Sequence, residues 1–134
     1  MNKKVLSILL IVMVFLVGCA NQEKLSSEDL EKYSALSQSA IENVANGDYD
    51  SFIGMCNDTM KNAIDEGQFK EITNLVNEKG EIVEFKEKDG IIMKDKSSGE
   101  SIKTIIQKVA QKDGESTYTI SFNENDELSG FYVK

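Results

Sequence analysis

Between residues 26 and 56, apolar positions recur every three or four residues, which is the spacing of a buried helix face. Ser26 and Asp29 resemble a capping box, and Asn46-Gly47 ends the pattern where a C-cap glycine is expected. We predict a first helix whose buried face comprises Leu30, Tyr33, Leu36 or Ser37, Ala40, Ile41 and Val44. Asp48 is placed to cap a second helix, with a buried stripe of Tyr49, Phe52, Ile53 and Cys56.

Residues 57–59 form a polar break, in which Asp58 or Thr59 is placed to cap a short helical turn through Met60 and Ile64. The pattern then predicts a third helix over residues 66–78, which ends at Gly80. Its buried face comprises Phe69, Ile72, Leu75 and Val76.

After residue 80 the pattern changes from helical spacing to alternation. Residues 81–88 predict a strand with Val83 and Phe85 on one face, and Asp89-Gly90 predicts a hairpin turn. Residues 91–94 then return as a short strand, and 96–100 are expected to form an exposed loop.

Residues 101–112 fit two patterns. A helix would bury Ile102, Ile105, Ile106 and Val109, whereas a strand would place Ile102, Thr104 and Ile106 on one face. The many β-branched residues and the flanking turns favour the strand. Asp113-Gly114 predicts a second hairpin, followed by strands over 117–122 and 128–133 with a turn over 123–127. The chain therefore predicts an α+β fold in which N-terminal helices pack on a curved antiparallel sheet.

A different pattern precedes residue 26. Lys3 and Lys4 come before an apolar stretch over 5–17 that is broken only by Ser7, and Leu16-Val17-Gly18-Cys19 follows. Thirteen residues span about 20 Å as a helix, which is less than the ~30 Å hydrocarbon core of a bilayer. A basic start, a short apolar run and small residues are typical of a secretory signal.

The segment ending at Cys19 resembles the lipobox of bacterial lipoproteins, whose cysteine thiol carries a diacylglycerol after the signal is removed. This resemblance implies a signal peptide over 1–18, a lipidated Cys19 with a polar tether over 19–26, and a domain over 27–134. The acyl chains would hold that domain at the outer face of the cytoplasmic membrane without spanning it.

Composition excludes several function classes. Without Lys3 and Lys4, 13 lysines face 23 acidic residues, a net charge of −10 that would repel nucleic acid. The sequence has no His and no Arg, so it lacks an imidazole base, a histidine metal ligand and a bidentate clamp for anions. We therefore expect neither a cofactor nor a metal, and no catalytic residue is predicted.

The remaining candidate sites have ordinary structural explanations. Once Cys19 carries a lipid, Cys56 has no disulfide partner, and its place on an apolar stripe predicts burial. The pattern around Asp48 and Asp50 fails as a calcium loop because Phe52 and Ile53 occupy required positions. The oxygen-rich residues of 123–127 are expected to form a solvated turn. The aromatic residues are expected to fill the core: Tyr33, Tyr49, Phe52, Phe69, Tyr118 and Phe122.

A family resemblance emerges from short segments that recur in order along residues 40–134. They are Asn46-Gly47-Asp48-Tyr49, Met60-Lys61, Gly80, and the ending Thr119-Ile120-Ser121-Phe122-Asn123 with Leu128-Ser129-Gly130-Phe131. Together they resemble a bacterial domain-of-unknown-function family with a nuclear-transport-factor-2-like (cystatin-like) fold. That family occurs in small lipoproteins and ahead of secreted alpha/beta hydrolases. The resemblance implies a cone of helices over a bent sheet, and it supplies no catalytic residues.

These observations favour a membrane-anchored, non-catalytic module that binds a small apolar ligand or a surface protein. One alternative is a small hydrolase or isomerase that uses Lys and Asp in the cone. The other is a structural spacer that forms a homodimer through the open face of the sheet. The ligand-binding residues stay unknown from the sequence alone.

Overall fold

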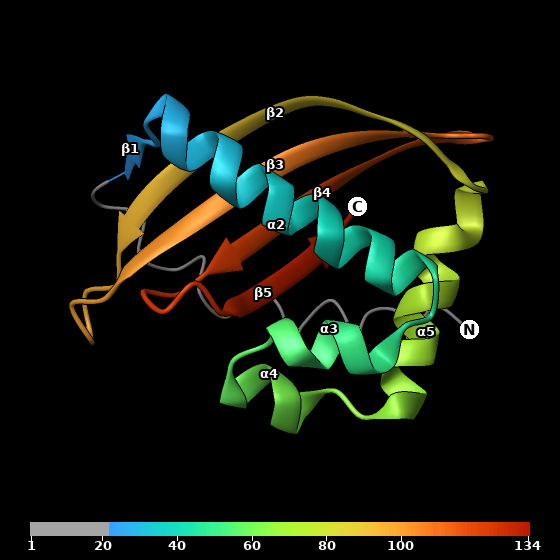
Figure 1. Cartoon of the computed structure of the whole chain (residues 1–134), viewed down its shortest axis with the longest axis horizontal. Helices are drawn as coiled ribbons and strands as arrows, with labels where there is room; N and C mark the ends of the chain where they lie inside the picture. The colour runs from blue at the N-terminus through green and yellow to red at the C-terminus, as the bar shows by residue number, and fades with distance from the viewer. Residues whose placement is uncertain (1–21) are drawn as a thin grey trace.

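The computed structural model describes residues 22–134, in which four α-helices pack on one side of a curved five-stranded sheet (Figure 1). The α+β prediction is therefore confirmed, and the arrangement agrees with a cone of helices over a bent sheet. The predicted signal peptide and Cys19 lie outside the described residues. Within residues 22–134, no helix has the length and apolar character needed to cross a bilayer.

Local capping explains where the helices begin. The hydroxyl of Ser26 accepts the backbone N–H of Asp29 at the start of α2 (Ser27–Ala45). Asp48 caps α3 (Tyr49–Met55) in the same way, as predicted. The cap of α4 (Asp58–Ala63) is Asn57, not the predicted Asp58 or Thr59, because its side-chain oxygen accepts the N–H of Met60 at 2.9 Å. A full capping box begins α5 (Glu66–Val76), which continues into the 3₁₀ turn η2 (Asn77–Lys79).

The sheet is an antiparallel meander in chain order. Its strands are β1 (Gln22–Lys24), β2 (Ile82–Lys94), β3 (Ser101–Gln111), β4 (Gly114–Phe122) and β5 (Leu128–Val133). Residues 101–111 form a strand, so the strand interpretation of that segment is confirmed. The turn between β3 and β4 lies at Lys112-Asp113, one residue before the predicted Asp113-Gly114.

The predicted hairpin at Asp89-Gly90 is wrong, because β2 passes through both residues without turning. Gly90 pairs with Ile105 in the ladder between β2 and β3. A Cβ at this position would lie 2.7 Å from Leu25 Cδ1, 3.0 Å from Leu30 Cδ1 and 3.1 Å from Ile105 Cδ1. Gly90 therefore permits close packing of side chains on a strand and does not serve a turn.

Residues 22–26, which the sequence predicted as tether, belong to the folded domain. β1 pairs antiparallel with the end of β2, with Gln22 opposite Met93 and Lys24 opposite Ile91. The N–H of Leu25 donates to the carbonyl of Gly90 at 3.0 Å, and the Leu25 side chain packs against the core. The first described residue therefore lies at the edge of the sheet, three residues after Cys19.

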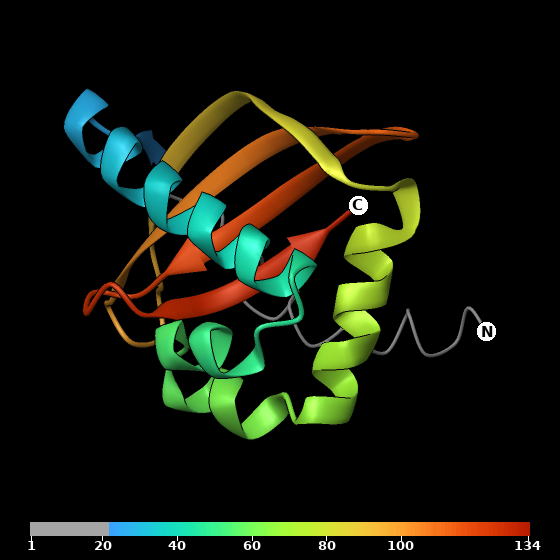
Figure 2. The same ribbon diagram turned by 45° about the vertical axis from the view of Figure 1, so that its right-hand side comes forward.

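The core lies between the helices and the concave face of the sheet (Figure 2). Five pairs of aromatic rings pack with centroids 5.3 to 5.8 Å apart, so the predicted aromatic residues fill the core. Cys56 is buried as predicted, and its thiol donates to the carbonyl of Phe52. On β3 the inward residues are Ile105, Gln107, Val109 and Gln111, whereas Ile106 is exposed on the outer face.

Two bulges bend β2 near its start, between Ile82 and Glu84 and between Phe85 and Lys88. The first bulge explains why Val83 does not share a face with Phe85 as predicted: Val83 is 69% exposed, whereas Phe85 packs against the core. At the second bulge the buried Gln107 amide donates to the carbonyl of Lys86 at 3.0 Å. A side chain of β3 thus donates to a backbone oxygen in the irregular part of the ladder.

We predict that Gly90→Ala lowers the free energy of unfolding by about 1–2 kcal/mol, because the added methyl group must displace Leu25 and Leu30. The control is Gly54→Ala in α3, where a Cβ meets nothing within 4 Å. That change should stabilise the helix by about 0.5–1 kcal/mol. Urea denaturation of both variants checks the pair, and a neutral Gly90→Ala would contradict this packing.

Candidate functional site

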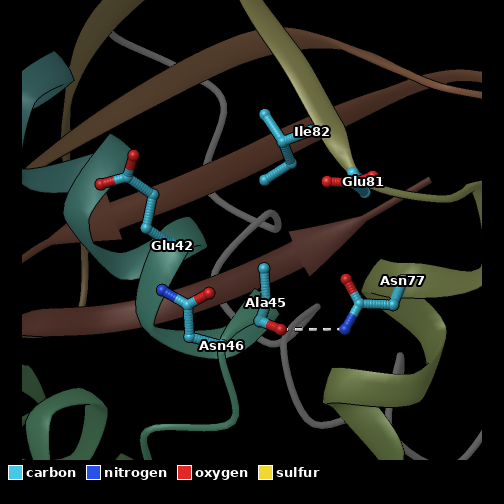
Figure 3. Close-up of a pocket in the computed structure, with 6 residues that line it drawn as sticks. All are labelled: Glu42, Ala45, Asn46, Asn77, Glu81 and Ile82. Carbon is cyan, nitrogen blue, oxygen red and sulfur yellow. Dashed lines mark hydrogen bonds between the residues drawn. The ribbon is translucent and has the colours of Figure 1, made fainter.

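A pocket of about 350 Å³ opens where the C-terminal end of α2 approaches η2 and the start of β2 (Figure 3). Ala45 and Ile82 contribute apolar surface to it. Two carboxylates and two carboxamides supply the polar lining, from Glu42, Asn46, Asn77 and Glu81. Glu42 and Glu81 are both exposed, so the pocket is open to solvent and is separate from the packed interior.

The pocket has negative electrostatic character for two reasons. Glu42 and Glu81 contribute formal charges, and no lysine lines the pocket. The C-terminal end of α2 also lies here and has no basic residue in its last turn, whereas α5 continues into η2, whose last turn contains Lys79. A helix C-terminus carries a partial negative charge, which adds to that of the carboxylates. The lining therefore favours an occupant with positive charge or several hydrogen-bond donors.

Two amide side chains hold the pocket walls in place. Asn77 Nδ2 donates to the carbonyl of Ala45 at 2.9 Å, which joins the end of α2 to the end of α5 (Figure 3). From the sheet, Gln111 Nε2 donates to the carbonyls of Val76 at 2.7 Å and Gly80 at 2.8 Å. Its own oxygen accepts the Ser116 hydroxyl at 2.6 Å. These bonds fix η2 against β3, so the pocket is built into the fold.

A second polar cluster lies at the other end of α2, beside the turn between β4 and β5. The Asp126 carboxylate accepts the Tyr33 hydroxyl at 2.5 Å and the Lys32 ammonium at 2.7 Å. The Lys32 and Lys103 ammonium groups lie 5.2 Å and 5.5 Å from the centre of the Tyr33 ring. This cluster brings lysine and aspartate together around a buried phenol, as the predicted Lys/Asp enzyme would require.

The contacts in this cluster move its pKa values away from neutrality. The hydrogen bonds from Lys32 and then from Tyr33 lower the pKa of Asp126, and the bond to Asp126 raises the pKa of Lys32. Burial, followed by the bond to Asp126, raises the pKa of Tyr33. A general base works best with a pKa near the working pH, and a nucleophilic lysine needs a lowered pKa. The cluster therefore holds each group in its resting charge state.

Other groups considered from the sequence take structural roles. Burial raises the pKa of the Cys56 thiol to about 12, which keeps it protonated and unreactive. In the turn over 123–127, the Asn123 side-chain oxygen accepts the N–H groups of Asn125 and Glu127. Among residues 22–134, no three potential ligands gather at a metal-binding distance. Cys19 lies outside the described residues.

Sequence reasoning missed all six pocket residues, because only some of the features that could indicate them lie in neighbouring residues. Asn46 directly follows the first predicted helix, where asparagine is common, Asn77 lies in the last turn of the third predicted helix, and Glu81 follows the helix-ending Gly80. Nothing in the linear pattern places residue 42 near residue 81. The packing of α2 beside the start of β2 brings both residues to the pocket, and no pattern in the sequence indicates that packing.

Comparison with known proteins identifies a family. The model of the family described as "Protein of unknown function (DUF3887)" matches residues 37–131, so the chain belongs to that family. An NMR structure of a protein from Ruminococcus gnavus ATCC 29149 is similar with a TM-score of 0.67. That similarity has 18% sequence identity and covers 80% of this chain and 90% of the other, which supports the fold alone. No curated protein matches.

We predict that Asp126→Asn lowers stability at neutral pH and that the loss disappears in acid. Asparagine tolerates the backbone φ of 62° at this position, so the change removes charge without adding strain. A carboxyl group with a lowered folded-state pKa stabilises the protein above its unfolded pKa, about 3.9, and this contribution is lost as the pH falls through the folded value. Urea unfolding at several pH values measures it. Asp113→Asn, in the turn between β3 and β4, is the control, and an equal pH profile for both variants would contradict the assignment.

Proposed function

We propose that this protein is an extracytoplasmic lipoprotein, anchored through Cys19, whose domain is a non-catalytic binding module. The observation that carries the binding role is the pocket at the α2–η2 junction. It combines a concave volume of about 350 Å³ with polar lining residues from the end of α2, from η2 and from the residue that precedes β2. Amide hydrogen bonds to Ala45, Val76 and Gly80 hold its walls, as a preformed site requires.

The chemistry of the lining selects the class of occupant. Two carboxylates and the C-terminal end of α2 favour an ammonium or guanidinium group, carried by a small molecule or by a lysine or arginine of a surface protein. Ala45 and Ile82 supply room for a short aliphatic stem. The proposed ligand is therefore polar and cationic, in contrast to the apolar ligand expected from the sequence.

The state of the interior supports a non-catalytic role. Among residues 22–134, the buried polar side chains are all neutral: Ser34, Ser37, Thr104, Gln107, Gln111, Ser116 and Ser121. A hydrolase or isomerase working inside the cone would need an ionisable group with a pKa shifted toward neutrality. In the Asp126 cluster, by contrast, the pKa of Asp126 is lowered and the pKa of Lys32 is raised, so both values move away from neutrality.

We predict that the wild-type protein incorporates radiolabelled palmitate and fractionates with membranes, whereas Cys19→Ser incorporates none and keeps its signal peptide. Cys56→Ser is the control, because its thiol is buried and should not influence processing. Labelling, cell fractionation and mass measurement of the N-terminus check this. The anchor proposal fails if the wild-type protein carries no label, or if Cys19→Ser is processed normally.

We predict that spermidine, a polyamine probe, shifts the backbone amide resonances of Asn46, Asn77 and Glu81 in a titration followed by NMR. The double variant Glu42→Gln/Glu81→Gln should lose these shifts, because it removes the pocket charge while keeping the side-chain shape. Glu31→Gln/Glu84→Gln is a matched control that makes the same charge change at exposed positions of α2 and β2. Equal shifts in both double variants, or none in the wild type, would disprove the cationic selectivity.

A further inference from the structure

The position of β1 determines how an anchored domain stands on the membrane. We propose that the end formed by β1, the loop over 95–100 and the turn over 123–127 faces the lipid headgroups, and that the pocket opens away from them. This inference rests on the lipidation of Cys19 in the proposed function. It adds an interaction surface, a bilayer surface as partner, and a direction for the binding site.

The connection between Cys19 and the sheet is short. Only Ala20 and Asn21 lie between Cys19 and β1, so three residue steps join the lipidated cysteine to the sheet. These steps span at most about 10 Å. β1 cannot move away from the sheet at no cost, because it pairs with β2 and the Leu25 side chain packs against the core beside Gly90. The sheet edge therefore stays within a short distance of the headgroups.

Hydrogen bonds connect the segments that lie at the same end of the domain as β1. Gln22 pairs with Met93, one residue before the end of β2, so the loop over 95–100 follows directly. Within that end, the N–H of Ser101, the first residue of β3 after the loop, donates to the Glu124 carboxylate at 2.9 Å, which joins the start of β3 to the turn over 123–127. The Asp126 contacts with Lys32 and Tyr33 join the same turn to α2. These bonds make the anchor-proximal end a single connected surface.

The pocket lies at the opposite end of the domain. In Figures 1 and 2, β1 lies at the left, whereas the C-terminal end of α2, α5 and the start of β2 lie at the right. β3 runs between the two ends for 11 residues, which is about 30 Å. A molecule approaching from outside the cell would therefore meet the pocket before the membrane-facing end.

The orientation rests on the short connection and not on charge. The three segments of the anchor-proximal end are acidic, since Lys24 and Lys96 face six carboxylates: Glu23, Asp95, Glu100, Glu124, Asp126 and Glu127. Anionic headgroups would repel this end as well as the pocket end, and the short connection holds it near the bilayer against that repulsion.

The test uses the full-length lipidated protein in liposomes that contain headgroup-spin-labelled lipid. Lys96→Cys and Lys112→Cys each place one fluorophore, at opposite ends of β3, and they make the same chemical change at exposed positions. Cys56 takes no label because it is buried and its pKa is raised to about 12, and Cys19 is occupied by the lipid. A third protein carries Lys96→Cys together with a Gly-Ser linker of about twenty residues after Asn21, which reaches roughly 25 Å.

We expect strong loss of fluorescence at position 96, little loss at position 112, and partial recovery at position 96 when the linker is present. Equal quenching at both positions, or stronger quenching at 112, would overturn the orientation. Mass measurement on the same samples reports the lipid separately. If Cys19 carries no lipid, the anchor proposal fails first, whereas a lipidated protein with equal quenching refutes the orientation alone.

Discussion

Two glutamine side chains buried on β3 tie the irregular start of β2 and the end of η2 to the sheet. Gln107 donates to the carbonyl of Lys86 at the second bulge of β2, and Gln111 donates to those of Val76 and Gly80. A buried carbonyl without a partner costs about 1–3 kcal/mol, which is a large share of the stability of a domain this size. Apolar residues at these two positions could fill the space but could not donate to those oxygens. The amides thus connect β3 to the elements that line the pocket.

Much of the helical half was predictable, because helix boundaries depend on neighbouring residues. Ser26 and Asp48 cap the helices that the sequence assigned to them. The sheet was harder, since Asp-Gly has the same local signature in a turn and in a crowded strand. At Gly90 the deciding contacts come from Leu25, Leu30 and Ile105, none of which adjoins it in sequence. Likewise β1 is only three residues long and has no alternation of its own, so its partner β2 defines it.

The candidate sites also differ in whether neighbouring residues or residues distant in the sequence form them. The motif around Cys19 is contiguous, so sequence alone could propose it, and the burial of Cys56 followed from helical spacing. The pocket is lined by residues 42–46 and 77–82, which are distant in the sequence. The buried amides beside it could not be predicted from the spacing of residues. Family membership adds the expectation of a shared fold but no chemistry, because the family is described as of unknown function. The functional proposal therefore rests on the shape and charge of the pocket.

Both margins of the sheet are protected against strand addition, in different ways. β1 covers the last part of β2, and the open part of that strand carries charges at Glu84, Lys86, Glu87 and Lys88. On the far margin, Cys56 bridges to Leu128 and the N–H of Asn57 donates to the Leu128 carbonyl. Exposed strand edges invite pairing between molecules, and a high local concentration brings such edges together often. Crowded copies of this domain could thus collide repeatedly without merging their sheets into an aggregate.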